Sequence, residues 1–420
     1  MCFSLFLPIL VSGAGLFMLV KLRFFFIVHP TRSGCEFFRE LRSPRSRRAL
    51  WLALAGTLGV GNIFGVAAGI MIGGAGSVFW LLFSSIFSMA LKYSETTLAL
   101  SLKSKDGHGM HTVLRAVFPR FGGKISKFYA IVCLILSLFM GSAIQSSAFV
   151  DTAQYAFAIA RSTSAILLAF LCLIPMIGGA DKIERVSSYL IPLATAAYIL
   201  LSLASLVRFA DRIPTALIRI TEEAFTPLAP CGGLISFLTS RALYEGFARG
   251  LLSNEAGVGT SAMAHSRSDE RAPRVAGLFG ICEVFFDTDL LCGSTALVIL
   301  CSVKDIQAYE TPMSLVVAAF EASLGGFARL PLTLCILIFA YSTMICWYYY
   351  GCECRRYIFG KGGALYTFAF IFFIFVGSIW GHSSLILITD ILLFLMAAPT
   401  CAALIRRSDE IYRLTKNEPH

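Results

Sequence analysis

One apolar segment of membrane-spanning length carries a glycine-rich polar stretch at its middle. The polar and glycine positions are Gly56, Thr57, Gly59, Gly61 and Asn62. Each glycine lowers helix preference by about 1 kcal/mol relative to alanine, so we expect the helix to unwind here. Unwound backbone in a membrane is tolerated where it lines a cavity; its carbonyls can then coordinate a cation, and a freed helix N-terminus can face a carboxylate. Close helix packing through small residues is the alternative.

A second apolar segment carries two adjacent hydroxyls, Ser342 and Thr343. Together with backbone carbonyls they could supply about five oxygens to a small hard cation. Alternatively, each hydroxyl bonds the carbonyl four residues earlier, as is common in membrane helices. Trp347 lies one turn beyond Thr343 on the same face, where it could close over a small ligand or anchor the helix at the membrane interface.

Polar side chains deep in apolar segments are costly and indicate function. Asp287, followed by Thr288, predicts a cation site or a relay; a buried ion pair with a basic residue such as Arg241 is the alternative. Gln145 is a lone amide that could bond a ligand or a neighbouring helix. Glu283 lies nearer the end of its segment, where we expect it to be solvated.

A polar motif follows the end of another predicted span. Its candidate residues are Arg249, Asn254, Glu255 and Gly257. We interpret it as a structured, glycine-pinned turn on the cytoplasmic side that acts as a gate.

The composition indicates the medium in which these groups lie. Of 420 residues, 57% are hydrophobic and 14% charged, against about 45–50% and 25% in soluble proteins. This excludes a cytosolic enzyme, a disordered chain and a disulfide scaffold, and it predicts an all-α polytopic membrane protein. The net charge of +10 then orients the helices instead of binding nucleic acid. The sequence lacks the phosphate-binding, hydrolase and zinc-protease motifs, so we expect no enzyme, no cofactor and no ATPase subunit.

Eleven segments have the length of a membrane span. They are residues 3–28, 50–72, 76–101, 127–150, 164–180, 187–208, 231–252, 275–302, 328–350, 363–381 and 383–405. Basic residues concentrate in alternate loops, which predicts an external N-terminus and a cytoplasmic C-terminus. A further apolar stretch, 308–325, is too short to span and is expected to form an external lid helix in the interface.

The segments also show a weak internal symmetry. The glycine-rich span 50–72 and the span 231–252, five spans later, have opposite orientations. Two sets of five inverted spans are typical of a transporter built from inverted repeats. We therefore expect a single domain over 1–420, with a leading helix at 1–28, a first repeat at 50–208 and a second at 231–405.

Four blocks make the chain resemble the alanine/glycine:cation symporter family, the sodium:alanine symporters. They are Gly59-Val60-Gly61-Asn62-Ile63-Phe64-Gly65 with Lys92-Tyr93-Ser94-Glu95, Arg249-Gly250-Leu251-Leu252-Ser253-Asn254-Glu255-Ala256-Gly257, Phe286-Asp287-Thr288, and Trp347-Tyr348-Tyr349-Tyr350-Gly351. The likeness covers roughly residues 10–405.

The resemblance implies a leucine-transporter-like 5+5 inverted repeat with one extra N-terminal helix, in a bacterial cytoplasmic membrane. It implies sodium as the coupling ion and a small amino acid, alanine or glycine, as cargo. Sodium would then bind the carbonyls of Ala55, Leu58 and Phe339 and the hydroxyls of Ser342 and Thr343, with Asp287 as a further cation group. The amino acid would lie against Thr57, Gly59, Gly61, Asn62 and Gln145, with Trp347 bounding the pocket.

The chain departs from the family pattern at two places. Val60 stands where the family usually has threonine, and Ser236, Phe237 and Leu238 replace small residues. Bulk there would reshape the pocket, so cargo identity stays open. Two alternatives to sodium symport also remain: proton coupling through Asp287, and an amino-acid sensor that binds without transporting.

Overall fold

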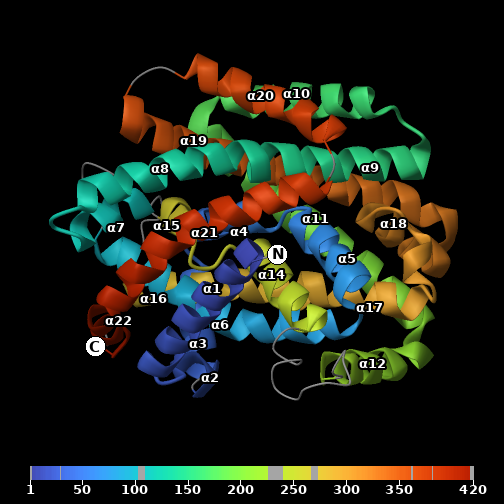
Figure 1. The fold of residues 1–420 in the computed structure, drawn as a ribbon, viewed down its shortest axis with the longest axis horizontal. Helices are drawn as coiled ribbons and strands as arrows, with labels where there is room; N and C mark the ends of the chain where they lie inside the picture. Colours follow the sequence, from blue (N-terminus) through green and yellow to red (C-terminus); the bar gives the residue numbers. More distant parts are fainter. Residues whose placement is uncertain are drawn as a thin grey trace.

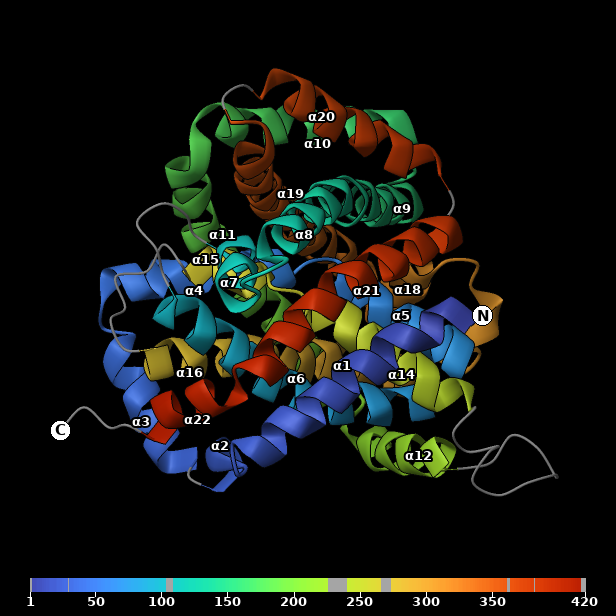
Figure 2. The same ribbon diagram turned by 60° about the vertical axis from the view of Figure 1, so that its left-hand side comes forward.

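The computed structural model describes residues 2–28, 30–102, 109–225, 240–265, 273–360, 363–380 and 382–416. Within these ranges every regular element is a helix (Figures 1 and 2). Seven helical segments are long and apolar enough to cross a membrane, and three shorter apolar helices accompany them. The expected all-helical class is confirmed. The count of eleven spans and the two five-span repeats stay predictions.

The glycine-rich helix is broken where the sequence predicts. α4 (Pro44–Thr57) ends in the polar stretch, and α5 (Gly61–Gly73) begins after the nonhelical residues Leu58–Val60. The Gly59 amide bonds the Thr57 carbonyl at 2.7 Å, so a tight turn joins the two halves. α4 itself starts earlier than the predicted span, because Pro44 at its first turn favours helix initiation.

A second broken helix lies beside the first. α14 (Arg241–Asn254) leads through a turn at Glu255–Gly259 into the short α15 (Thr260–His265). Glu255, Gly257 and Gly259 have φ of 54°, 77° and 97°, the left-handed region that ends a helix. α14 packs against α5 and α15 against α4, so the two broken helices run antiparallel.

The second broken helix changes one predicted span. Within the described residues, the helix α14 of the predicted segment 231–252 begins at Arg241, and it continues beyond residue 252 to Asn254. Residues 231–239, including Ser236, Phe237 and Leu238, lie outside the described residues.

α6 (Gly76–Ser101) is the centre of one helix group. α14, α16 (Pro273–Val284) and α1 (Cys2–Lys21) pack along it. A Cβ at Gly250 of α14 would lie 2.2 Å from Ser84 Oγ of α6, so small residues let these helices approach closely. α16 continues through a π-helical segment, Phe285–Cys292, into α17 (Gly293–Ser302).

α19 (Arg329–Phe359) is the centre of a second group. It packs against α8 (Gly122–Leu138), α9 (Gln145–Phe157), α11 (Gly179–Arg208) and the first broken helix. A second π-helical segment, Phe139–Ile144, joins α8 to α9, which follow one line in Figure 1. Such segments occur frequently at functional sites. Here they adjoin Gln145 and contain Asp287, two residues singled out from the sequence.

The remaining helices cover these two groups. α10 and α20 lie together on the outer side of α9 (Figure 1), and α21 packs against α1 and α8 (Figure 2). Their bounds, with those of the other helices, are α2 (Phe25–Val28), α3 (Pro30–Glu40), α7 (Met110–Val117), α10 (Arg161–Ile177), α12 (Ile213–Phe225), α18 (Pro312–Leu324), α20 (Ala364–Ile379), α21 (His382–Arg406) and α22 (Ser408–Lys416).

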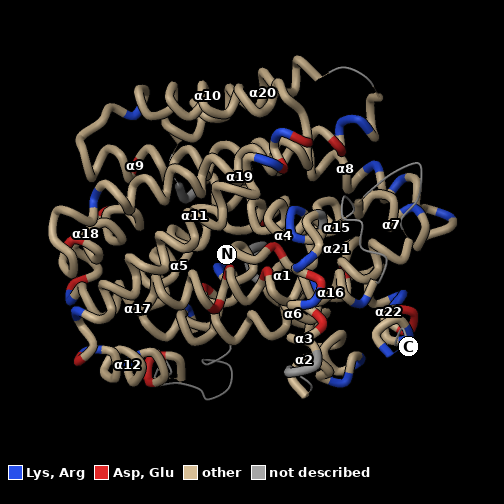
Figure 3. The backbone as a smooth tube through the Cα atoms, turned by 180° about the vertical axis from the view of Figure 1, so that it is seen from behind, with Lys and Arg blue, Asp and Glu red and all other residues tan. Residues whose placement is uncertain are grey.

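The surface pattern suits a bilayer. The outer faces of α10, α11 and α20 expose large apolar side chains such as Phe170, Leu200 and Phe368, whereas Ser187 and Ser202 of α11 face inward at 0% exposure. Lys and Arg gather at one end, around α7, the start of α8, and α22 (Figure 3). The apolar stretch 308–325 does contain a helix, α18, but one face of it is buried against α5, α9 and α17.

Candidate functional site

Thr343 of α19 bonds the end of α4. Its Oγ1 donates a 3.0 Å hydrogen bond to the carbonyl of Ala55. The neighbouring Ser342 is fully buried, and its hydroxyl has no hydrogen-bond partner among the described residues. Neither hydroxyl therefore follows the alternative of bonding the carbonyl four residues earlier. Leu58 and Phe339, the other predicted carbonyl ligands, are fully buried as well.

Gly59 lies between Thr343 and Gln145. A Cβ at Gly59 would stand 2.7 Å from Thr343 Oγ1 and 3.0 Å from Gln145 Oε1. Gln145 Oε1 accepts a 3.1 Å hydrogen bond from the Val60 amide, and Nε2 donates to the Met140 carbonyl at 3.3 Å. The Gln145 side chain, whose partner was not predicted, thus bonds both the unwound backbone and the helical segment that precedes it. A side chain larger than that of Gly59 would press on Gln145 and on Thr343 of α19.

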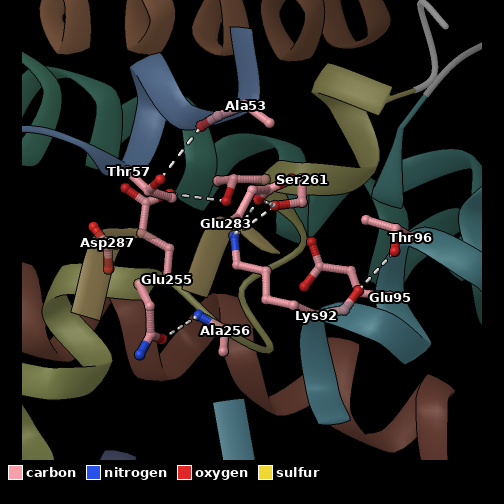
Figure 4. A network of polar contacts seen from close by, with 12 residues as sticks. Ala53, Thr57, Lys92, Glu95, Thr96, Glu255, Ala256, Ser261, Glu283 and Asp287 are labelled. Atoms are coloured by element: carbon pink, nitrogen blue, oxygen red, sulfur yellow. Dashed lines mark hydrogen bonds and ion pairs between the residues drawn. The ribbon is translucent and has the colours of Figure 1, made fainter. Parts of the chain in front are cut away.

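Open space borders the start of α5. A Cβ added at Gly61 or Gly65 would meet no atom of the described residues within 4 Å. Positions four apart lie on one face of a helix, so the two glycines open the same side of α5. Thr57 is buried, and its hydroxyl lies 3.5 Å from the carbonyl of Ala53 in its own helix (Figure 4).

Asp287 is the centre of a buried polar cluster. Asn62 Nδ2 donates to Oδ1, and Thr288 Oγ1 lies 3.0 Å from Oδ2. Ser253 Oγ lies 2.8 Å from Oδ2 and 2.9 Å from Asn62 Oδ1. Arg241, the alternative partner, is exposed at the start of α14 and makes no described ion pair with Asp287. One carboxylate therefore joins both broken helices to the π-helical segment.

The predicted glycine-pinned turn is buried. Glu255 is 1% exposed; its Oε1 accepts a 3.1 Å bond from Trp347 Nε1, and its Oε2 accepts one of 2.8 Å from Thr260. Asn254 Oδ1 accepts the Ala256 amide at 3.0 Å, which fixes the turn (Figure 4). The turn is structured, as expected, and the chain continues from it into α15; its cytoplasmic side and its role as a gate stay predictions. Gly257 supplies the expected glycine pin, at positive φ.

Trp347 is fully buried, which excludes the interface anchor. It packs against Gly141 of the π-helical segment after α8, where a Cβ would lie 2.3 Å from its own Cβ. Its ring is thereby held between α8 and the Glu255 turn.

Arg249 lies within α14 and not in the turn. Its Nε donates to Glu245 Oε2 at 3.0 Å, while Nη1 has no partner among the described residues. Asp390 of α21 is 8% exposed, and its Oδ1 is likewise without a described partner. The two charges are near enough to interact, yet no hydrogen bond or ion pair joins them.

A buried ionic cluster was missed from the sequence. Lys92 Nζ lies 2.5 Å from Ser261 Oγ and 3.4 Å from Glu283 Oε2 (Figure 4). His265 bonds the other oxygen of Glu283. Glu283 is fully buried, so the expectation that it is solvated was wrong. The available signal was its spacing: Glu283 lies four residues before Asp287, on the same side of one helix.

Two thiols border the site. Cys346 Sγ donates to the Leu52 carbonyl at 3.3 Å beside the Thr343 region. Cys292 Sγ donates to the Asp287 carbonyl at 3.3 Å and lies 3.3 Å from Ser253 Oγ. Both cysteines are buried.

Comparison with known proteins identifies the family of the chain. Residues 1–417 match the model of the sodium:alanine symporter family. An uncharacterized transporter of Haemophilus influenzae is 31% identical over 98% of this chain and 92% of its own. The sodium/alanine symporter AgcS of Methanococcus maripaludis is 30% identical over 97% and 93%. The amino-acid carrier protein AlsT of Bacillus subtilis is 26% identical over 96% and 87%.

Solved structures show a related fold. A Na+-coupled sialic acid symporter in an outward-open state superposes with a TM-score of 0.57 at 12% identity, over 98% of this chain and 86% of that one. A variant of the Eremococcus coleocola manganese transporter gives 0.56 at 14% identity, over 90% and 79%. At such identities the likeness concerns the helix arrangement alone.

Proposed function

Because the chain belongs to the sodium:alanine symporter family, we propose that it couples entry of sodium to uptake of a small neutral amino acid, alanine or glycine. It is a multi-pass membrane transporter and not an enzyme. The proposed setting is a cytoplasmic membrane with the N-terminus outside and the C-terminus inside. The basic end around α7, α8 and α22 supports that orientation.

The observation that carries the proposal is the unpaired hydroxyl of Ser342. A buried hydroxyl without a partner costs about 1–3 kcal/mol, so a ligand that satisfies it is favoured. Ser342 is adjacent in the chain to Thr343, whose Oγ1 donates to the Ala55 carbonyl at the end of a broken helix. Hydroxyl and carbonyl oxygens suit a hard monovalent cation, and we assign sodium to this place, with Leu58 and Phe339 supplying further carbonyls.

We assign the amino acid to the space beside Gly61. The start of α5 carries the positive end of a helix dipole, which favours a carboxylate. Gly59, Asn62, Thr57 and Gln145 border the break. The absence of side chains at Gly61 and Gly65 leaves room for a small ligand. Val60, with no hydroxyl, presents an apolar surface at the same turn, which suits a short aliphatic side chain.

We propose that the two antiparallel broken helices move during transport. They support an inverted-repeat transporter, in which one helix group rocks against the other around a central site. Sodium and amino acid would both favour the arrangement in which α4 is tied to α19; a ligand with equal affinity for both states would shift nothing. The hydrogen bond between Trp347 and Glu255 would hold α19 to the turn of the second broken helix in this arrangement. Arg249 and Asp390, which are not bonded here, would pair in the other arrangement.

The test is uptake of radiolabelled alanine and glycine into proteoliposomes, with and without an inward sodium gradient. Accumulation above equilibrium only with sodium supports the proposal. Accumulation that depends on a proton gradient and not on sodium would show that protons are the coupling ion. If the folded protein binds the amino acid but does not take it up, the chain is a sensor.

A further inference from the structure

The buried ionic cluster is not used by the proposed sodium and amino-acid sites. It lies where α6, α15 and α16 meet, and Figure 4 shows Lys92, Ser261 and Glu283 together there. Its charged members are Lys92, Glu95, His265 and Glu283, with Glu255 and Asp287 close by. Every one of these side chains is at most 2% exposed.

Most of these groups have the partners that their charged forms need. Glu283 receives Lys92, Ser261 and His265. Glu255 accepts from Trp347 and Thr260. Asp287 accepts from Asn62 and Thr288, with Ser253 within reach.

Glu95 is different. Its Oε1 accepts a 3.3 Å hydrogen bond from the Ala262 amide of α15, but its Oε2 has no partner among the described residues. The residue is 0% exposed, so water does not satisfy that oxygen at the surface. Figure 4 shows the carboxyl turned toward the Lys92 side chain, into the cluster.

Charge balance gives the missing ligand. The titratable groups that interact with Glu95 are Lys92 on its own helix, Glu283 on α16, Tyr129 on α8 and Cys401 on α21. Glu255 and His265 belong to the same cluster through their interactions with Lys92 and Glu283. The carboxyls Glu95, Glu255, Glu283 and Asp287 face one lysine and one histidine. If all four were ionised, at least two negative charges would stay uncompensated in a buried place, which is strongly unfavourable.

The ligand that fits is a proton. A metal ion would need about six oxygen ligands, and Glu95 offers one free oxygen beside an ammonium group that repels cations. A proton needs only one oxygen, and by binding Glu95 Oε2 it neutralises the negative charge of that carboxylate.

We propose that Glu95 is a proton-binding site, separate from the sodium site, that holds a proton while α15 packs on α6 and releases it when α15 moves away. The backbone donors to Glu95 are the amide of Ala262 in α15 and that of Gly259 in the turn just before it, so both belong to the second broken helix. Water reaching the opened carboxyl takes the proton, and the carboxylate is then solvated. Protonation therefore stabilises the arrangement described here, and rising pH favours opening of α15.

The first experiment measures the proton itself. Infrared spectra of the purified protein in bilayers are recorded across a pH titration, and the carbonyl stretching band of a protonated carboxyl is followed. Glu95→Gln should lose one such band. Glu353→Gln, which alters a carboxylate bonded to Arg356 on the surface of α19, should keep it. A protonated-carboxyl signal that is as large in Glu95→Gln as in the wild type overturns the proposal.

The second experiment measures the opening of α15 in the wild-type chain, so its result does not depend on whether a variant folds. Amide hydrogen exchange at residues 260–265 of the wild-type chain, corrected for intrinsic rates, should speed up by about tenfold or more once pH rises past the titration of the band. Exchange in the middle of α19 is the internal reference. Corrected exchange that is independent of pH overturns the proposal. Neither measurement depends on uptake. The proton-binding proposal and the sodium-symport proposal can therefore each be overturned without affecting the other.

Discussion

Thr343 and Ala55 are 288 residues apart in the chain, yet a 3.0 Å hydrogen bond joins the hydroxyl of one to the carbonyl of the other. The bond ties α19 to the last turn of α4, beside the unpaired hydroxyl of Ser342. Ligand affinity and fold stability can therefore be separated here, because one hydroxyl supports the fold and its neighbour makes no described hydrogen bond.

Thr343→Ala should weaken sodium dependence far more than it lowers abundance. One hydrogen bond contributes about 0.5–1.5 kcal/mol to stability, which a folded membrane protein can lose. We expect the sodium concentration for half-maximal uptake to rise about tenfold or more, the equivalent of about 1.4 kcal/mol of binding. Thr343→Ser keeps the hydroxyl and should stay close to wild type. Unchanged sodium dependence at normal abundance would show that the cation site is misplaced.

Ser342→Ala should behave differently without sodium. Removing a buried hydroxyl that has no partner costs no hydrogen bond, so the sodium-free melting temperature should be equal to or above that of the wild type. Sodium should then raise the melting temperature less than it does in wild type, because a ligand stabilises only the state that binds it. Equal sodium-induced shifts in both proteins would exclude Ser342 as a ligand.

Gly59→Ala and Gly61→Ala form a matched pair that differs in the space available. A Cβ at Gly59 would press on Thr343 Oγ1 at 2.7 Å, whereas one at Gly61 meets nothing described within 4 Å. We expect Gly59→Ala to abolish sodium-induced stabilisation. Gly61→Ala should keep it and weaken alanine binding more than glycine binding. Sodium and amino-acid titrations by thermal shift compare the two; identical behaviour would contradict the separate assignments.

Glu283→Gln should destabilise the fold by about 3–5 kcal/mol, because Lys92 then remains as a buried charge without its carboxylate. Adding Lys92→Met to the same chain should recover a large part of that loss. The matched control is Glu353→Gln, which breaks a surface ion pair worth about 0–1 kcal/mol. Thermal unfolding in detergent measures all three. Equal melting temperatures for Glu283→Gln and the control would argue against an ionised Lys92–Glu283 pair.

The sequence was most informative where one local signal sufficed. Glycines next to Thr57 and Asn62 predicted the break between α4 and α5, because helix preference is a local property. The cost of an acid in an apolar segment likewise singled out Asp287. Its partners Asn62 and Ser253 lie on other helices, and composition or spacing does not predict these contacts.

The second break shows where such reasoning fails. The motif around Glu255 is polar and glycine-rich, and polar segments between apolar ones normally face water. Here α15 follows, and pairing with Trp347 and Thr260 satisfies the buried Glu255 carboxyl. The same long-range compensation hides Lys92, whose partners Ser261 and Glu283 lie on other helices. Burial of a charge depends on tertiary partners, and these appear only in the folded chain.

The alkylation rates of the Cys346 and Cys292 thiols can report how often the site opens. Each sulfur is buried and directed at a backbone carbonyl, one in α4 and the other at Asp287. An alkylating reagent requires an accessible thiolate, so each cysteine can react only during excursions that part it from its carbonyl. Cys35 is exposed and reacts without such an excursion. The alkylation rate of Cys346 or Cys292, divided by that of Cys35, therefore reports how often the backbone near each buried thiol opens. The same ratios, measured with sodium or an amino acid present, report how far each ligand slows that opening.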